Sequence, residues 1–240
     1  MIEIELLFAM DIGGALSTVC RRIESLKARQ HVRLVAVSKT KSVEDILEAY
    51  RWGQRHFGEN YVQELCEKAP MLPRDIQWHF IGHLQTNKVK QLLHGTGDSL
   101  AFIESVDSAK LASKINAVVE GIERTRPLQV MIQVNSSGEL SKSGVAPEDS
   151  VDLARHIVEE CPHLALSGIM TIGKLTDEPN DECFDVLVQC REQVAKALGR
   201  DAEELELSMG MSGDFELAIS KGSTNVRVGS TIFGARRALQ

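Results

Sequence analysis

The sequence has no excess of basic residues. Its 27 lysines and arginines are outnumbered by 34 aspartates and glutamates, which gives a formal net charge of −7. Because nucleic-acid phosphates require a basic footprint, this balance argues against nucleic-acid binding as the main function. It does not exclude a small local site for an anion.

Long apolar runs are also missing. None approaches the roughly 18 residues that cross a bilayer. Residues 1–8 carry two acids where a secretory signal would carry a basic leader. We therefore expect a cytoplasmic protein that does not engage membranes.

Cysteine is scarce and scattered. The chain has five cysteines, none of them in a CxxC pair: Cys20, Cys66, Cys161, Cys183 and Cys190. Dispersed thiols in odd number are typical of free cysteines in a reducing compartment, and they predict neither a disulfide framework nor a zinc site. There is also no long linker, internal repeat or low-complexity tract, so residues 1–240 are predicted to form a single domain.

Short apolar runs alternate with stretches of helical periodicity along the chain. Val43, Ile46, Leu47 and Tyr50, for example, lie on one face of a helix. The apolar runs predict eight strands at 32–38, 56–58, 76–82, 100–105, 128–134, 164–172, 205–209 and 225–228. Eight strands with intervening helices are typical of an α/β protein with a (β/α)8 TIM barrel.

An extra helix is predicted before the barrel. Residues 10–30 place Leu16, Val19, Ile23 and Leu26 at helical spacing. The alternative architecture is an open doubly wound sheet. The GxGxxG turn that marks such a sheet is absent after the first strand.

Lys39 directly follows the first predicted strand. In α/β barrels, ligands bind at the carboxyl ends of the strands. An amine that is partly shielded from water loses its proton more readily, and a neutral amine can attack an aldehyde to form a Schiff base. The alternative is that Lys39 simply extends into solvent, as most lysines at strand ends do.

Glycine, serine and threonine gather near the carboxyl terminus. The loop 209–213 follows the seventh strand, and the segment 222–234 contains the eighth. Backbone N–H groups and hydroxyls in such loops can bind an anion, and barrels often hold phosphate after strands seven and eight. Two neighbouring loops of this kind predict a phosphate cup. The alternative is a pair of ordinary glycine-rich turns.

Arg227 stands inside the eighth predicted strand, between Val226 and Val228. If it points into the barrel it needs a partner, because an unpaired buried charge is destabilising, and a ligand atom at the barrel mouth is one candidate. If it points outward, it packs against a helix. The pattern does not choose between these orientations, because a shift of one residue in strand register reverses them.

Several longer motifs resemble those of one protein family. They are 35–39 (VAVSK), 57–64 (FGENYVQE), 78–88 (WHFIGHLQTNK), 141–144 (SKSG), 166–172 (LSGIMTI), 207–212 (LSMGMS) and 222–236. In these motifs, which run in order from about residue 10 to the end, the chain resembles the pyridoxal phosphate homeostasis proteins. Those are single-domain barrels related to the barrel half of alanine racemase.

The resemblance implies a cofactor, pyridoxal 5′-phosphate (PLP), held by Lys39 as a Schiff base. Ser212, Gly229 and Ser230, with Thr231, would contact the phosphate. The full implied set of cofactor-binding residues is Lys39, Asn60, His79, Met209, Ser212, Arg227, Gly229, Ser230 and Thr231. The family's usual pair of acids after Met-Ser is replaced here by Gly213 and Asp214.

The implied position of Arg227 is opposite the pyridine nitrogen. Arginine does not give up its proton in proteins, so it would leave that nitrogen unprotonated. A neutral pyridine is a weaker electron sink than a pyridinium, which disfavours carbanion chemistry.

Two further loops carry polar side chains. His83, Gln85, Asn87 and Lys88 follow the third strand. They form either a patch over the cofactor or a docking surface for a receiving enzyme, or else a solvated loop in which Thr86 or Asn87 caps the next helix. Glu139, Ser141 and Lys142 follow the fifth strand, either as a lid or as an ordinary exposed loop.

The favoured function is a non-catalytic PLP carrier in intracellular vitamin B6 homeostasis that supplies the cofactor to apoenzymes and is monomeric. The alternatives are a PLP-dependent amino-acid racemase or related fold-type III enzyme, and a Schiff-base aldolase without cofactor. A two-base racemase of this fold generally uses a tyrosine from an additional β domain, and the chain ends soon after the eighth strand. Its two tyrosines, Tyr50 and Tyr61, lie in the first quarter, which favours the carrier, although His79 remains a candidate base.

Overall fold

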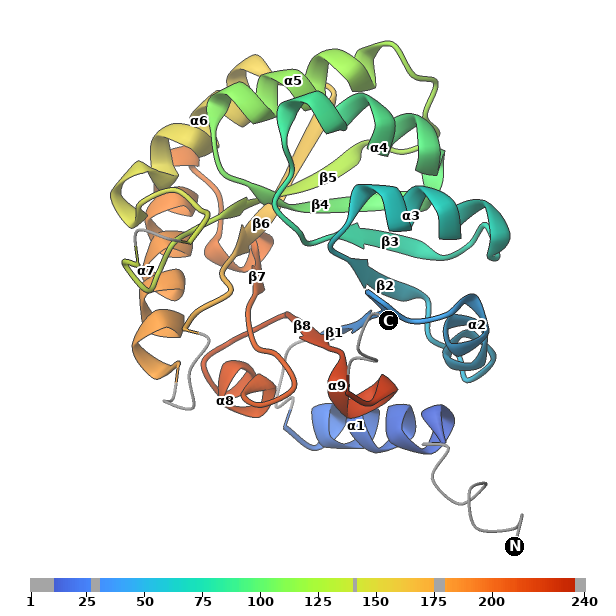
Figure 1. The fold of residues 1–240 in the computed structure, drawn as a ribbon. Helices are drawn as coiled ribbons and strands as arrows, with labels where there is room; N and C mark the ends of the chain where they lie inside the picture. The colour runs from blue at the N-terminus through green and yellow to red at the C-terminus, as the bar shows by residue number, and fades with distance from the viewer. Residues whose placement is uncertain (1–10, 27–30, 140–141, 175–179, 236–240) are drawn as a thin grey trace, which may run out of the picture.

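A computed structural model describes residues 11–26, 31–139, 142–174 and 180–235. Eight parallel strands form a closed barrel in sequence order (Figure 1). The strands are β1 (Arg33–Val37), β2 (His56–Glu59), β3 (Gln77–Phe80), β4 (Leu100–Val106), β5 (Leu128–Gln133), β6 (Leu164–Met170), β7 (Glu206–Ser208) and β8 (Asn225–Val228). The barrel closes where β8 pairs with β1, with Arg33 beside Asn225. The predicted (β/α)8 fold is confirmed.

Helices surround the barrel on its outer face (Figure 1). They are α1 (Ile12–Leu26), α2 (Val43–Arg51), α3 (Val62–Lys68), α4 (Val89–Thr96), α5 (Ala109–Glu120), α6 (Ser150–Glu160), α7 (Asp181–Leu198), α8 (Phe215–Ser220) and α9 (Ser230–Phe233). The main apolar core lies between this ring and the strands, where branched side chains such as Ile46, Leu92 and Leu187 are fully buried. Burial of such side chains is the main stabilising contribution to the fold.

The extra helix predicted within 10–30 is α1. It packs beside α2, α8 and α9 and so covers the seam where the barrel closes (Figure 1). Its apolar stripe of Leu16, Val19 and Ile23 is buried there. The helix α2 begins with a reciprocal capping box between Ser42 and Asp45.

The segment before α4 differs from the predicted cap. Neither Thr86 nor Asn87 caps the helix with its side chain. Instead a 3-10 turn, Thr86–Lys88, runs directly into α4, which begins at Val89. A continuous turn presents its own carbonyls to the following N–H groups, so no side-chain acceptor is required.

Within the described ranges, no helix is both long enough and apolar enough to span a bilayer. No cluster of three or more described histidine, cysteine or acidic side chains is arranged to hold a metal ion. All five cysteines are free thiols.

Candidate functional site

A pocket of about 410 Å³ opens at the carboxyl ends of the barrel strands. Its walls include residues just after β2, β7 and β8, together with apolar side chains such as Ile81 and Ile172. Six of the predicted site residues line it: Lys39, Asn60, Ser212, Arg227, Gly229 and Ser230. The fold therefore gathers at one opening residues that are up to 191 positions apart, from Lys39 to Ser230.

Lys39 leaves the end of β1 and reaches this pocket. The preceding residue, Ser38, is fully buried, so the backbone at the base of Lys39 is shielded from water. A second amine, that of Lys41, also lines the pocket. Its Nζ donates hydrogen bonds to the carbonyls of Phe233 (2.8 Å) and Gly234 (3.2 Å), which ties the loop after β1 to the end of α9.

The loops after β7 and β8 meet as predicted. The N–H of Gly229 donates to the Ser212 Oγ at 3.1 Å, so the two loops are joined directly. Gly213 and Ser230 line the pocket beside this bond. Hydroxyls and backbone N–H groups of this kind can cradle an anion.

Position 229 requires a glycine. A Cβ there would lie 3.3 Å from both the carbonyl oxygen and the Cβ of Val37, which is tighter than ordinary packing. The close approach brings the β8 end against the β1 end. It thereby places the anion cradle beside the segment that carries Lys39.

Asp214 shapes the loop in which the family's usual acid pair is replaced. Its Oδ1 accepts from the N–H of Met211 at 2.6 Å, and its Oδ2 accepts from the Asn180 side chain at 2.8 Å. The carboxylate is thus used to hold this loop to itself and to Asn180, while the neighbouring Ser212 lines the pocket.

Asn60 supplies a polar group without a protein partner. Its Oδ1 is buried and has no hydrogen-bond partner among the described residues. A buried acceptor left unpaired is destabilising, so its place in the pocket wall suits a ligand that donates a hydrogen bond. PLP carries a phenolic hydroxyl, an aldehyde and a phosphate. The Asn60 amide oxygen suits the hydroxyl, a lysine amine suits the aldehyde, and the anion cradle suits the phosphate.

Arg227 points into the barrel, which decides between the two orientations that the sequence left open. It is 3% exposed and still reaches the pocket. Its guanidinium donates to the Ser208 Oγ at 2.5 Å and to the carbonyl of Thr171 at 2.7 Å. Burial lowers the pKa of Arg227, while the charges of Glu104 and Asp214 raise it, and arginine remains a cation at neutral pH.

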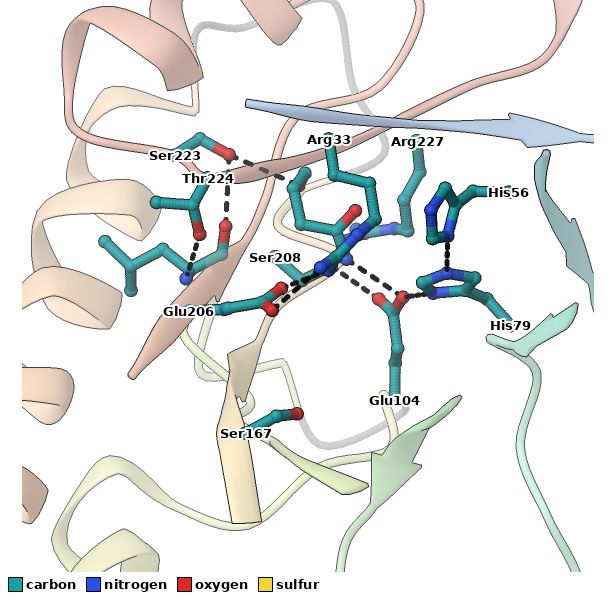
Figure 2. Close-up of polar contacts among 12 residues, drawn as sticks. Arg33, His56, His79, Glu104, Ser167, Glu206, Ser208, Ser223, Thr224 and Arg227 are labelled. Carbon is teal, nitrogen blue, oxygen red and sulfur yellow. Dashed lines mark hydrogen bonds and ion pairs between the residues drawn. The ribbon is translucent and has the colours of Figure 1, made fainter. Parts of the chain in front are cut away.

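Behind Arg227 a network of polar side chains crosses the barrel interior (Figure 2). Glu104, fully buried on β4, accepts from the Ser208 Oγ at 2.5 Å and from the Asn225 amide at 3.0 Å. It also accepts from the His79 Nδ1 at 2.5 Å, and the His79 Nε2 lies 3.0 Å from the His56 Nδ1. The network thus connects Arg227 to β2, β3 and β4.

Three predicted site residues do not line the pocket. His79 is fully buried in this network and stacks on Phe102 with ring centroids 4.3 Å apart. Met209 is fully buried in the main core, and Thr231 lies in the first turn of α9. Contact of these three residues with a cofactor remains a prediction.

The protonation states of this network follow from its burial. Desolvation lowers the pKa of His79, and together with the charges of His79 and Arg33 it lowers the pKa of His56 to about 3. Desolvation raises the pKa of Glu104, but hydrogen bonds from His79 and Ser208 and the charge of Arg227 outweigh it, so that the pKa falls to about 2. At neutral pH, His79 and His56 are therefore neutral and lie in line on one side of the Glu104 carboxylate, which Ser208 links to Arg227.

We expect acidification to destabilise the protein through His56. A neutral histidine with a lowered pKa stabilises the folded state above about pH 6.5, and that contribution is lost as the pH falls toward 3, by up to about 1.4 kcal/mol per pH unit. The free energy of urea unfolding at pH 7 and pH 5 measures this loss. His56→Asn, which retains a donor near the Nδ1 position, should show a smaller loss than the wild type.

The difference in pH dependence between the wild type and His56→Asn reports the contribution of His56 alone. Burial raises the pKa of Glu59 to about 7. Glu59 therefore stabilises the folded state at lower pH, the opposite of the histidine effect, and it does so equally in the wild type and in His56→Asn. His163→Asn, at an exposed histidine, is the matched control and should keep the wild-type pH dependence. Equal pH dependence in His56→Asn and the wild type would contradict a neutral buried His56.

The polar loops have mixed outcomes. His83, Gln85, Asn87 and Lys88 are exposed, and nothing in their contacts tests the docking prediction. Lys142 bonds to Glu139 at 2.6 Å and to the carbonyl of Gly173 at 2.9 Å. Ser141, the third residue of the predicted lid, lies outside the described residues.

Comparisons with known proteins agree with this geometry. Residues 14–237 match the family model described as alanine racemase, N-terminal domain. The pyridoxal phosphate homeostasis protein of Bos taurus is 47% identical over an alignment that covers 95% of this chain and 88% of the relative. The chain belongs to the pyridoxal phosphate homeostasis protein family.

Solved structures support the family. The structure of PipY from Synechococcus elongatus with PLP bound is 32% identical, with a TM-score of 0.75, and the match covers 93% of this chain and all of PipY. Alanine racemase from Corynebacterium glutamicum, at 16% identity and a TM-score of 0.67, is similar over 95% of this chain and 63% of its own length. The racemase comparison shows the shared barrel alone.

Lys41, Glu104 and Lys68 were not predicted from the sequence, although they lie in or behind the pocket. Glu104 and Lys68 each carry a signal that is visible in the sequence. Glu104 directly follows four apolar residues of β4, and Lys68 ends a helix whose other buried position, Leu65, is apolar. A charged residue at a buried position needs partners, which marks it as part of an internal network.

Proposed function

We propose that this protein binds PLP through a Schiff base at Lys39 and acts as a PLP carrier in vitamin B6 homeostasis. The observation that carries the proposal is the pocket in which Lys39 shares one opening with the Ser212–Gly229 cradle and Arg227. PLP supplies an aldehyde, which condenses reversibly with a primary amine, and an anionic phosphate. The relatives named as pyridoxal phosphate homeostasis proteins and the PLP-bound PipY support it.

Each side of the pocket has a role in this proposal. The loops after β7 and β8 bind the phosphate through the Ser212 hydroxyl and nearby backbone N–H groups. Asn60 accepts a hydrogen bond through its unpaired Oδ1. Arg227 donates to the ring nitrogen, and it keeps its own proton because Glu104 and Asp214 provide compensating charge.

The composition of the pocket favours a carrier over an enzyme. Among the described residues, its ionisable lining groups are Lys39, Lys41 and Arg227, with no tyrosine or histidine. Lys41 is already bonded to backbone carbonyls, and arginine is a poor base. No well-placed second acid–base group therefore accompanies Lys39, as a two-base racemisation would require.

The proposal includes delivery to apoenzymes by a monomer in a reducing cytoplasm. The pocket opens to the surface, so the cofactor can be reached from outside, and the five free cysteines suit a reducing compartment. The alternative function is a fold-type III racemase, which shares the barrel.

We expect the PLP-loaded protein to restore activity to a PLP-depleted aminotransferase while exchanging the α-protons of amino acids only at background rate. Loss of the lysine-bound absorption band during transfer reports release, and deuterium incorporation into alanine reports catalysis. Free PLP at equal concentration is the control for transfer. Exchange at about 1 s⁻¹ or faster, a rate typical of enzymes, would establish the racemase alternative.

A further inference from the structure

The backbone directly after Lys39 adopts an unusual conformation. Thr40 has φ of +63°, and among the described residues it is the single non-glycine with positive φ. The left-handed region is unfavourable for L-residues and especially for a β-branched one. Such a conformation persists only where surrounding contacts impose it.

Two side chains of α3 impose it. The N–H of Thr40 donates to the Glu64 Oε1 at 2.6 Å. The Lys68 Nζ donates to the same Glu64 oxygen at 2.5 Å and to the carbonyl of Ser38 at 2.9 Å. The peptide group before Lys39 and the one after it are therefore both attached to α3.

This attachment is buried. The Lys68 side chain is 9% exposed and Glu59, its second carboxylate partner at 2.9 Å, is fully buried. Glu59 also accepts from the Ser38 Oγ at 2.7 Å, so the cluster contacts the segment before Lys39 twice. Buried ion clusters are weak contributors to net stability, because desolvation offsets the attraction. Stability alone therefore does not explain why charged groups surround the base of Lys39.

We propose that Glu64 and Lys68 are positioning residues that hold Thr40 in its left-handed conformation and thereby aim Lys39 into the pocket. The inference rests on the proposed function, in which Lys39 attaches PLP. Without the two hydrogen bonds, Thr40 relaxes to an ordinary φ, the peptide plane between residues 39 and 40 turns, and the amine of Lys39 moves relative to the phosphate cradle. Attachment geometry of this kind is sensitive to small displacements.

The test is a double-mutant cycle between Glu64→Ala and Thr40→Gly. Glycine accepts positive φ without strain, so it makes the support from Glu64 unnecessary. We expect Glu64→Ala to weaken PLP binding about ten-fold in the wild-type background and about two-fold or less in the Thr40→Gly background. The half-saturating PLP concentration is read from the lysine-bound absorption band, and melting temperature is measured in parallel.

Glu67→Ala is the matched control. Glu67 lies on the same helix, is exposed and bonds to Gln63, so its removal should change PLP binding less than two-fold. If Glu64→Ala fails to fold, Glu64→Gln takes its place, with an expected loss of about three-fold that also disappears in the Thr40→Gly background.

Three outcomes are distinguishable. An equal loss of affinity in both backgrounds, or no loss in either, would overturn the positioning role, since a merely structural effect lowers the melting temperature without depending on residue 40. Loss confined to the threonine background supports it. Failure of the wild type to attach PLP at Lys39 would instead refute the proposed function.

Discussion

Lys39→Ala is expected to abolish the covalent attachment of PLP. The pocket offers the amine of Lys39 at the end of β1 next to the Ser212–Gly229 cradle, and alanine removes the nucleophile without filling the opening. Borohydride reduction of the PLP-loaded protein, followed by peptide mapping, should place a single pyridoxyl group on Lys39 in the wild type. The mutant should lose the lysine-bound absorption band and at least about 90% of the label.

Lys41→Ala is the control for this experiment, because it removes the other amine that lines the pocket. Lys41 donates to the carbonyls of Phe233 and Gly234, so its loss should loosen the turn after α9 while the label stays on Lys39. Labelling of Lys41 in the wild type, or an undiminished band in Lys39→Ala, would remove Lys39 from its assigned role.

Arg227→Met is expected to lower the free energy of unfolding by roughly 3–5 kcal/mol, the range for leaving a buried charge without its compensating charge. The Glu104 carboxylate is fully buried in the barrel interior and is linked to Arg227 through the Ser208 hydroxyl. The substitution removes the cation from the far side of Ser208. Urea unfolding at pH 7 measures the change. The double variant Arg227→Met/Glu104→Gln should lose at least about 1 kcal/mol less than the sum of the two single variants.

The control for this cycle is Arg51→Met. The Arg51 side chain is 70% exposed and pairs with Glu48 at 3.5 Å on the surface of α2, so its removal should stay within about 0.5 kcal/mol. Strictly additive losses in the Arg227 and Glu104 variants would show that the two charges act independently, against the network that joins them through Ser208.

Much of the architecture was predictable because its signals are local. The apolar runs that become β1, β4 and β5 are short and dense, and the intervening stripes repeat with the helical period. The observed strand ends differ from the predicted ones by one or two residues. The strand β3, for example, ends at Phe80, whereas the apolar run continues to Gly82. Hydrogen bonding to neighbouring strands sets those ends, and a single sequence does not contain it.

The site was predictable in part. The position of Lys39 after the first strand and the two glycine-rich loops followed from order along the chain and from the common arrangement of ligands in barrels. The resemblance to one family added Asn60 and favoured the inward orientation of Arg227, and both residues reach the pocket. The resemblance also implied His79, whose side chain turns to Glu104 within the barrel interior, and its contact with a cofactor remains a prediction.

By itself, the sequence determined the order of strands and helices, the amine at the first strand end and the small residues at the last two. Those features depend on residue type and spacing, which act over a few neighbouring positions. Only the tertiary structure decided that Arg227 faces inward, that Glu104 joins it through Ser208, and that α3 holds the backbone beside Lys39. Each depends on strand register or on contacts between distant segments, and closing the barrel is what brings those segments together.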